Sequence, residues 1–143
     1  MKFEISNAGD GQVFLLKNKE TGTEAEVYAF GALLNRFAIR KDNELVNVID
    51  GFSSVADAQQ HITEQFKSAK LSPFVCRLNK AAFSFEGKNY TIKKHFSGDS
   101  AIHGLLYDAV FTAASTHVDD HKAVLILRYK YDNGVQGFPF AYS

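Results

Sequence analysis

Along most of its length this sequence alternates apolar and polar residues with a period of two, and no other feature constrains its fold as strongly. Successive side chains of a β-strand point to opposite faces of a sheet, so this spacing predicts half-buried strands. In one clear case Ala25 and Val27 alternate with Glu24 and Glu26. Stretches of this kind are found at 3–5, 24–30, 34–39, 44–49, 82–86, 89–93 and 122–131, and a short apolar run lies at 12–17.

Turn signals separate several of these stretches. They are Lys41-Asp42-Asn43, Gly87 and Asp132-Asn133-Gly134. Asn, Asp and Gly tolerate the left-handed backbone that tight hairpin turns need, so these positions predict reversals of the chain. The stretch 122–131 carries apolar residues on both faces, and we expect it to lie inside a sandwich of two sheets.

One segment departs from the period of two. Its apolar residues recur at helical spacing, at Val55, Ala58, Ile62, Phe66 and Ala69. Ser54 is a plausible N-cap, with Asp57 three residues further on, so we predict one short helix over 54–69. Many strands and a single helix in 143 residues predict a mainly β fold, an antiparallel β-sandwich, with 1–143 as one domain or part of one.

Charge and cysteine content exclude several classes of function. Sixteen Lys and Arg balance sixteen Asp and Glu, so no overall field attracts nucleic acid or an anionic membrane. The apolar stretches are short and the N-terminus lacks an apolar signal core, so we expect a cytoplasmic protein. A single cysteine excludes an internal disulfide and a cysteine-rich zinc site. No glycine-rich phosphate loop is present, and we expect no cofactor.

Two of the five histidines flank an acidic pair. His117 and His121 surround Asp119-Asp120 in an expected loop, where a metal site and a solvated polar turn are both open and the turn is favoured. His61 falls on the polar side of the predicted helix and has no evident role.

Three residues in the middle of the chain are candidates for chemistry. Cys76 could be a nucleophile, but a lone cysteine in a strand is usually a small buried hydrophobe. Arg77 lies in the mostly apolar stretch 72–78, which we expect to be a strand, and it is either a site residue or a cation at a sheet edge. His103 is either a core residue or a site residue, because the following Gly104 lets a ligand approach the backbone.

Five short motifs occur in an order that resembles the aldose 1-epimerase (galactose mutarotase) family. Ala29-Phe30-Gly31-Ala32-Leu33 is similar to the family's Tyr-Gly-Ala strand, and 47–54 is similar to its segment Asn/Asp-Val-Val-Leu-Gly-Phe-Asp-Ser. Cys76-Arg77-Leu78 falls on Asn-Arg-Ile, His103-Gly104 on His-Gly, and Gly137-Phe138-Pro139 on Gly-Tyr-Pro-Gly. The resemblance implies the first half of a galactose mutarotase-like supersandwich.

The sequence also departs from the family pattern. Ser72-Pro73 stands where the family has Gly-Arg, Cys76 where it has Asn, Leu105 where it has a second Gly, and Phe140 where it has the last Gly of the proline motif. In the family a general acid (His) and a general base (Glu) follow that motif. No residue of this chain matches either one.

The resemblance implies an isomerase that interconverts the anomers of a hexose without a metal. Arg77 and His103 would hydrogen-bond sugar oxygens, His103 as the catalytic residue near the ring oxygen, and Cys76 would stand at a sugar-binding position. Lacking the acid and the base, the 143-residue chain is expected to be inactive by itself.

The resemblance implies that the sandwich takes strands from both halves of a longer domain, so the first half alone would expose apolar sheet faces and unpaired strand edges. We therefore expect a partner, either a second copy in a homodimer or a missing C-terminal half. Two other functions stay open. One is a non-catalytic carbohydrate-binding β-sandwich module, and the other is an interaction domain in which Arg77 and His103 only pack.

Overall fold

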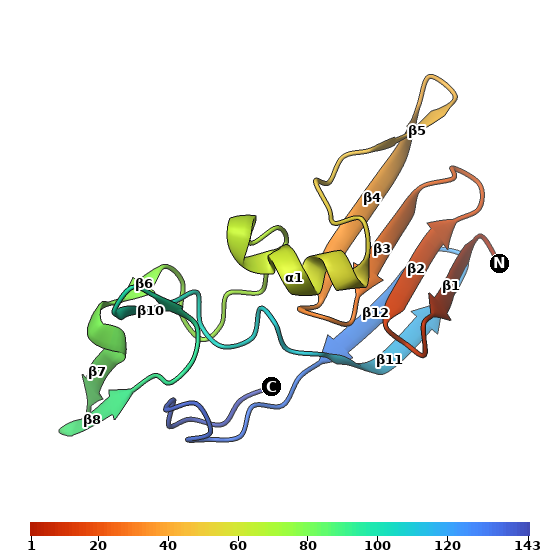
Figure 1. Ribbon diagram of the computed structural model, residues 1–143. Coiled ribbons are helices and arrows are strands. Elements are labelled where there is room, and N and C mark those ends of the chain that lie inside the picture. Colours follow the sequence, from red (N-terminus) through yellow and green to blue (C-terminus); the bar gives the residue numbers. More distant parts are fainter.

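All 143 residues are described by the computed structural model, which is mainly β with one α-helix, as predicted. The largest sheet has five antiparallel strands in sequence order: β1 (Phe3–Ala8), β2 (Val13–Asn18), β3 (Glu24–Tyr28), β4 (Leu33–Lys41) and β5 (Glu44–Asn47) (Figure 1). A three-stranded sheet contains β6 (Arg77–Leu78), β10 (Ser100–Ile102) and β9 (Phe96–Ser97) in that order. Two hairpins complete the strands: β7 (Ala82–Phe85) with β8 (Lys88–Thr91), and β11 (Thr112–Val118) with β12 (Ala123–Arg128).

Tight turns form at the predicted positions. Asp42 and Asn43 have φ values of 49° and 67° and join β4 to β5. Glu86 and Gly87, with φ values of 48° and 74°, join β7 to β8. Two consecutive residues with positive φ give a turn whose twist matches that of the paired strands.

The helix α1 (Val55–Gln65) begins where the sequence predicts and ends four residues earlier. The Ser54 hydroxyl accepts the N–H of Asp57 at 3.0 Å, and the Asp57 carboxylate accepts the N–H of Ser53 at 2.8 Å. The first bond satisfies an N–H group that the first turn of a helix leaves free, and the second ties the residue before the N-cap to the helix. Phe66 adopts a left-handed conformation (φ 53°) and ends the helix.

The helix covers one face of the five-stranded sheet and lies in front of it in Figure 1. Its buried residues Ala58 and Ile62 belong to a core cluster with Tyr28, Leu33 and other side chains of that face. This arrangement buries the apolar stripe that a helical period of 3.6 residues predicts.

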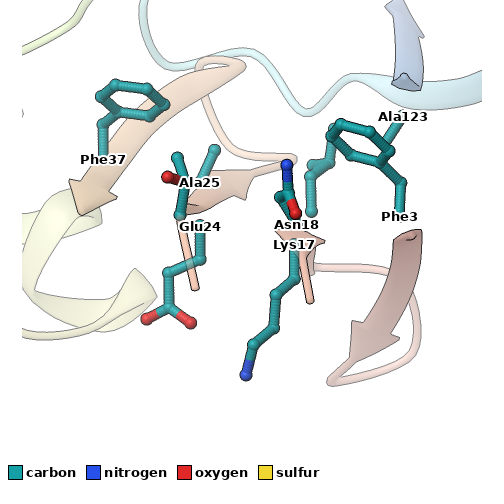
Figure 2. A pocket seen from close by; sticks show the side chains of 9 residues that line it. Phe3, Lys17, Asn18, Glu24, Ala25, Phe37 and Ala123 are labelled. Carbon is teal, nitrogen blue, oxygen red and sulfur yellow. The ribbon is translucent and has the colours of Figure 1, made fainter. Parts of the chain in front are cut away.

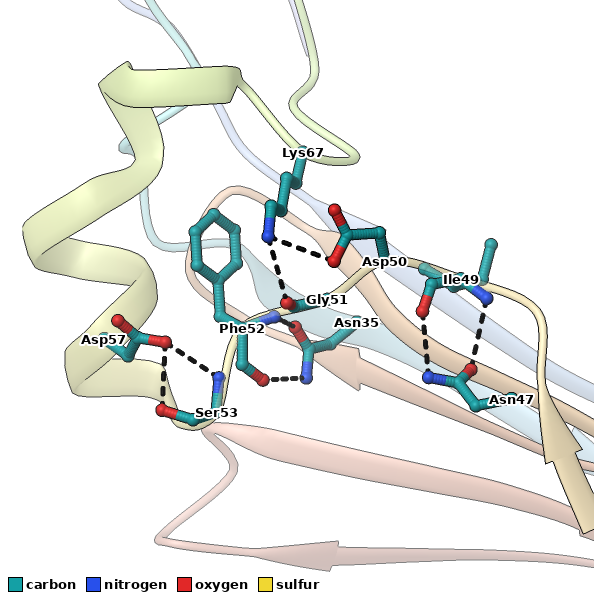
Figure 3. A network of polar contacts seen from close by, with 9 residues as sticks. All are labelled: Asn35, Asn47, Ile49, Asp50, Gly51, Phe52, Ser53, Asp57 and Lys67. Carbon is teal, nitrogen blue, oxygen red and sulfur yellow. Dashed lines mark hydrogen bonds and ion pairs between the residues drawn. The ribbon is translucent and has the colours of Figure 1, made fainter.

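A buried asparagine fixes the segment between β5 and the helix. Asn35 lies where a bulge shifts the β3–β4 register, and its amide nitrogen donates to the Tyr28 hydroxyl at 2.8 Å. The same side chain donates to the Phe52 carbonyl oxygen and accepts the Phe52 N–H (Figure 3). A buried amide satisfied in this way specifies one position for the segment that it holds.

The hairpin of β11 and β12 lies against β1 and β2, behind the sheet in Figure 1. No residue of β12 is fully buried, and Ile126 is 47% exposed. The prediction that 122–131 is covered on both faces is therefore wrong. The strand pairs with β11 alone, and no second layer lies over its outer face.

An open apolar groove separates this hairpin from the sheet. Phe3, Phe37 and Ala123 line it, and the side chains of Lys17 and Glu24 point away from them (Figure 2). The same apolar face continues over the outer strands of the sheet, where Phe37 is 36% exposed and Ile39 is 38% exposed. Part of the five-stranded sheet thus presents apolar side chains to solvent.

A second core supports β6, β7 and β10. Its buried members are Ala81, Ile92, Ala101, Leu105, Leu106, Ala109 and Tyr131. Only Arg77–Leu78 of the predicted strand 72–78 is a strand, because Ser72 pairs instead with Gly104. The chain contains no helix capable of spanning a lipid bilayer.

Candidate functional site

Arg77 and His103 meet where β6 pairs with β10. Arg77 lies opposite Ile102 in the antiparallel ladder, so His103 is the next residue along the partner strand. The two residues are 26 positions apart in sequence, and the pairing of β6 with β10 places them next to each other in the ladder. The two side chains are not joined by a hydrogen bond.

His103 and Cys76 are joined by two hydrogen bonds. The N–H of Cys76 donates to Nδ1 of His103 at 3.1 Å, and the N–H of His103 donates to the carbonyl oxygen of Cys76 at 3.0 Å. Because Nδ1 accepts a proton donor, the proton of the neutral imidazole resides on Nε2. The ring therefore presents an N–H donor on the side away from Cys76.

The turn at His103 and Gly104 is fixed by the backbone of Ser72. Both residues have positive φ, 60° and 76°. The N–H of Leu105 donates to the carbonyl oxygen of Ser72 at 2.6 Å. A left-handed histidine is uncommon, and such a conformation persists only where its surroundings determine it strongly.

Arg77 is exposed and has no carboxylate partner in the structure. It lies on an edge strand, since β6 pairs only with β10. A guanidinium without an internal partner keeps its five N–H donors available to a ligand or to water. This location at a sheet edge is compatible with both roles that the sequence leaves open for Arg77, a site residue and a cation at a sheet edge.

Cys76 is an exposed free thiol, not the small buried hydrophobe expected in a strand. It precedes β6 and has a φ of 59°. Its N–H and carbonyl groups, rather than its sulfur, hold His103. Asn tolerates the left-handed region far better than Cys does, so the backbone at this position disfavours the residue that occupies it.

Aromatic rings pack behind His103. Phe66 contacts the His103 ring edge-on with centroids 4.5 Å apart, and it contacts Tyr107 in the same way at 5.2 Å. Tyr107 is buried and stacks on His95 at 3.9 Å. Burial, and then the charge of Asp108, raise the pKa of Tyr107 to about 12. The sequence assigns no role to Phe66, Tyr107 or His95, because their contacts depend on chain folding and follow no motif.

His117 and His121 belong to a polar turn. The Asp119 carboxylate contacts Nε2 of His117 at 2.9 Å and accepts the N–H groups of His121 and Lys122. These bonds, the one to His117 first, lower the pKa of Asp119 to about 2. No group of three or more His, Cys, Asp or Glu side chains is placed to hold a metal ion.

His61 pairs with Asp57 one helical turn earlier, with Nδ1 2.7 Å from the carboxylate. This contact, with the hydrogen bond as the main cause, raises the pKa of His61. His61 and Asp57 form a local pair on the exposed side of α1, and His61 makes no hydrogen bond with the residues around His103.

Comparison with known proteins identifies the family of this sequence pattern. Residues 12–143 match the family model described as aldose 1-epimerase. Among curated proteins, none matches the chain significantly. The fold is similar to that of galactose 1-epimerase from Lactobacillus acidophilus NCFM, with 20% identity and a TM-score of 0.72; the match covers 97% of this chain and 41% of that one.

A second solved structure shares the fold. It is the GalM/aldose epimerase homologue from C. elegans, with 17% identity and a TM-score of 0.66, and the match covers 85% of this chain and 37% of that one. The chain thus spans less than half the length of either structure.

Proposed function

The chain belongs to the aldose 1-epimerase family, and from this premise we propose that it binds a hexose at the surface formed by His103 and Arg77. In this role His103 donates a hydrogen bond to the ring oxygen of the sugar, and Arg77 donates to its hydroxyl groups. Cys76 contributes mainly through its backbone, which orients His103.

The hydrogen bond from Cys76 to His103 carries this proposal. It commits Nδ1 as an acceptor and leaves Nε2–H as a donor of fixed direction. The ring oxygen of a pyranose can only accept, so a histidine with this tautomer is complementary to it. The unpaired guanidinium of Arg77 adds further donors, and Arg77 lies opposite Ile102, the residue that precedes His103.

Mutarotation requires three events at the sugar. A base removes the proton of the anomeric hydroxyl, the bond between the anomeric carbon and the ring oxygen breaks, and an acid protonates that oxygen. Each proton transfer contributes on the order of 10²–10⁴-fold to the rate. Negative charge develops on the ring oxygen as the bond breaks, so a hydrogen bond from Nε2–H of His103 is stronger in the transition state than in the bound sugar.

This assignment gives the chain two of the tasks of a mutarotase. It positions the hexose through Arg77, and it stabilises charge on the ring oxygen through His103. No residue among the 143 corresponds to the family's proton-transferring acid or base. A carbohydrate-binding module without catalysis is therefore the second candidate function.

Titration with galactose and with glucose, followed by amide NMR, tests the proposal. We expect saturable shifts at Cys76, Arg77 and His103. Arg77→Gln and His103→Phe should weaken the binding, while Arg128→Gln, a control at an exposed arginine of β12, should not. Absence of saturable shifts with either sugar would contradict the proposed function.

A further inference from the structure

His95 lies directly behind the turn that presents His103. Its side chain is only 8% exposed. Nδ1 is 2.8 Å from the carbonyl oxygen of Gly104, the residue that follows His103. Nε2 is 3.0 Å from Oδ2 of Asp108, in an ion-pair contact rather than a well-aligned hydrogen bond.

Asp108 is anchored on its other side by Lys94, whose Nζ lies 2.7 Å from Oδ1. Burial alone would raise the pKa of Asp108, but hydrogen bonds and charges of His95 and Lys94 lower it below its usual value. The carboxylate thus lies between the Lys94 ammonium and Nε2 of His95. It fixes the His95 ring from the side opposite Gly104.

Contacts from His95 also return to His103 through aromatic rings. Tyr107 stacks on His95, Phe66 contacts Tyr107, and Phe66 contacts His103. A polar path and an apolar path therefore connect the same two histidines. The polar path is the hydrogen bond between Nδ1 of His95 and the carbonyl oxygen of Gly104, a residue with left-handed backbone that directly follows His103.

We propose that His95 is a positioning residue for the hexose site, and that its Nδ1–H bond to the Gly104 carbonyl keeps Nε2–H of His103 aimed at the sugar. The inference rests on the proposed function for its ligand. Its physical basis is that consecutive left-handed residues need several restraints. The Ser72 and Cys76 bonds hold the turn from one side, and the His95 bond holds it from the other.

Two substitutions at position 95 separate this role from packing. In His95→Asn the amide nitrogen takes the place of Nδ1, so the donor to Gly104 remains and the contact with Asp108 is lost. In His95→Gln the amide nitrogen takes the place of Nε2, so the contact with Asp108 remains and the donor to Gly104 is lost. Both variants lose the ring that stacks on Tyr107, so a purely structural role affects them alike.

The imidazole nitrogens of His103, observed by long-range ¹H–¹⁵N NMR, are the first readout. We expect His95→Asn to keep an unprotonated Nδ1 and a protonated Nε2 at His103. In His95→Gln these signals should move toward an average of the two tautomers. Hexose affinity is the second readout, and it should fall on the order of tenfold in His95→Gln only. Losses of this size are typical when a side chain that orients a metal-binding residue by a hydrogen bond is removed.

Equal behaviour of the two variants in both readouts would overturn the proposal. The unsubstituted chain supplies a check that needs no variant to fold: Nδ1 of His95 must carry a proton, and finding it unprotonated would also overturn the proposal. If the unsubstituted chain binds no hexose, the proposed function fails, while the His103 signals still decide the role of His95.

Discussion

The carbonyl oxygen of Ser72 occupies the space into which a side chain at Gly104 would project. A Cβ added to Gly104 would lie 2.1 Å from that oxygen. The same oxygen accepts the N–H of Leu105, so it cannot move away without losing a hydrogen bond. Glycine at this position is what allows the His103 turn to pack against the segment that leads into β6.

Gly104→Ala should therefore be much more destabilising than Gly98→Ala. Both glycines have positive φ, 76° and 64°, so alanine pays a backbone cost of about 1–2 kcal/mol at either site. Space around Gly98 is open, whereas alanine at 104 overlaps the Ser72 carbonyl and should lose about 1–3 kcal/mol more. Urea unfolding of the two variants measures the difference, and equal free energies of unfolding would contradict the close approach.

Cys76→Asn should stabilise the protein. The left-handed conformation at φ 59° disfavours cysteine, while asparagine adopts it readily, so we expect a gain of a few tenths to about 1 kcal/mol. The backbone bonds to His103 do not depend on the side chain. Cys76→Ser is the matched control, since serine has no such preference. An Asn variant no more stable than the Ser variant would refute the explanation.

The 143-residue chain should equilibrate hexose anomers slowly, if at all. Without counterparts of the family's acid and base, it lacks two contributions that are each worth on the order of 10²–10⁴-fold. Polarimetry of freshly dissolved α-galactose, with and without the purified chain, measures the rate. Enzyme-like equilibration that His103→Phe abolishes would show that this chain contains a base that the sequence comparison misses.

Alkaline pH should destabilise the fold through its buried tyrosines. Burial and, after it, the charge of Glu26 raise the pKa of Tyr28 to about 12, and Tyr107 is raised to about 12 as well. An unfolded tyrosine titrates near 10, so the stabilising contribution is complete below about pH 10 and is lost as the pH rises toward about 12. In Tyr107→Phe the free energy of unfolding should fall less steeply over this range. An unchanged slope would contradict the assignment.

The exposed apolar face of the sheet should drive self-association. Phe37 and Ile39 are each more than one third exposed on the face that α1 does not cover. Burial of apolar surface is favourable by about 25 cal/mol per Å², and a second copy offers the same surface. Light scattering should show a dimer that Phe37→Thr with Ile39→Thr weakens. Val135→Thr, at an equally apolar but separate exposed position, is the control; a monomer at all concentrations would rule the homodimer out.

Local signals in the sequence predict the elements well. The alternation at 24–30 predicts β3, Asp42-Asn43 predicts its hairpin turn, and Ser54 predicts the start of α1. Each of these depends on side-chain period, backbone preference or capping, which act over a few residues. The family motifs add the pair Arg77 and His103, and the register of β6 with β10 brings these positions together.

The sequence by itself determined the five strands of the large sheet, the helix start and the identity of the motif residues, because those follow from interactions between near neighbours along the chain. It did not indicate β9, β10 or β11. Only the tertiary structure decided which residues support the motif. The Ser72 carbonyl against Gly104, the His95 bond to the same residue and the half-covered state of β12 all depend on segments far apart in sequence. Such contacts are set by how sheets and loops pack, and no period or local preference encodes them.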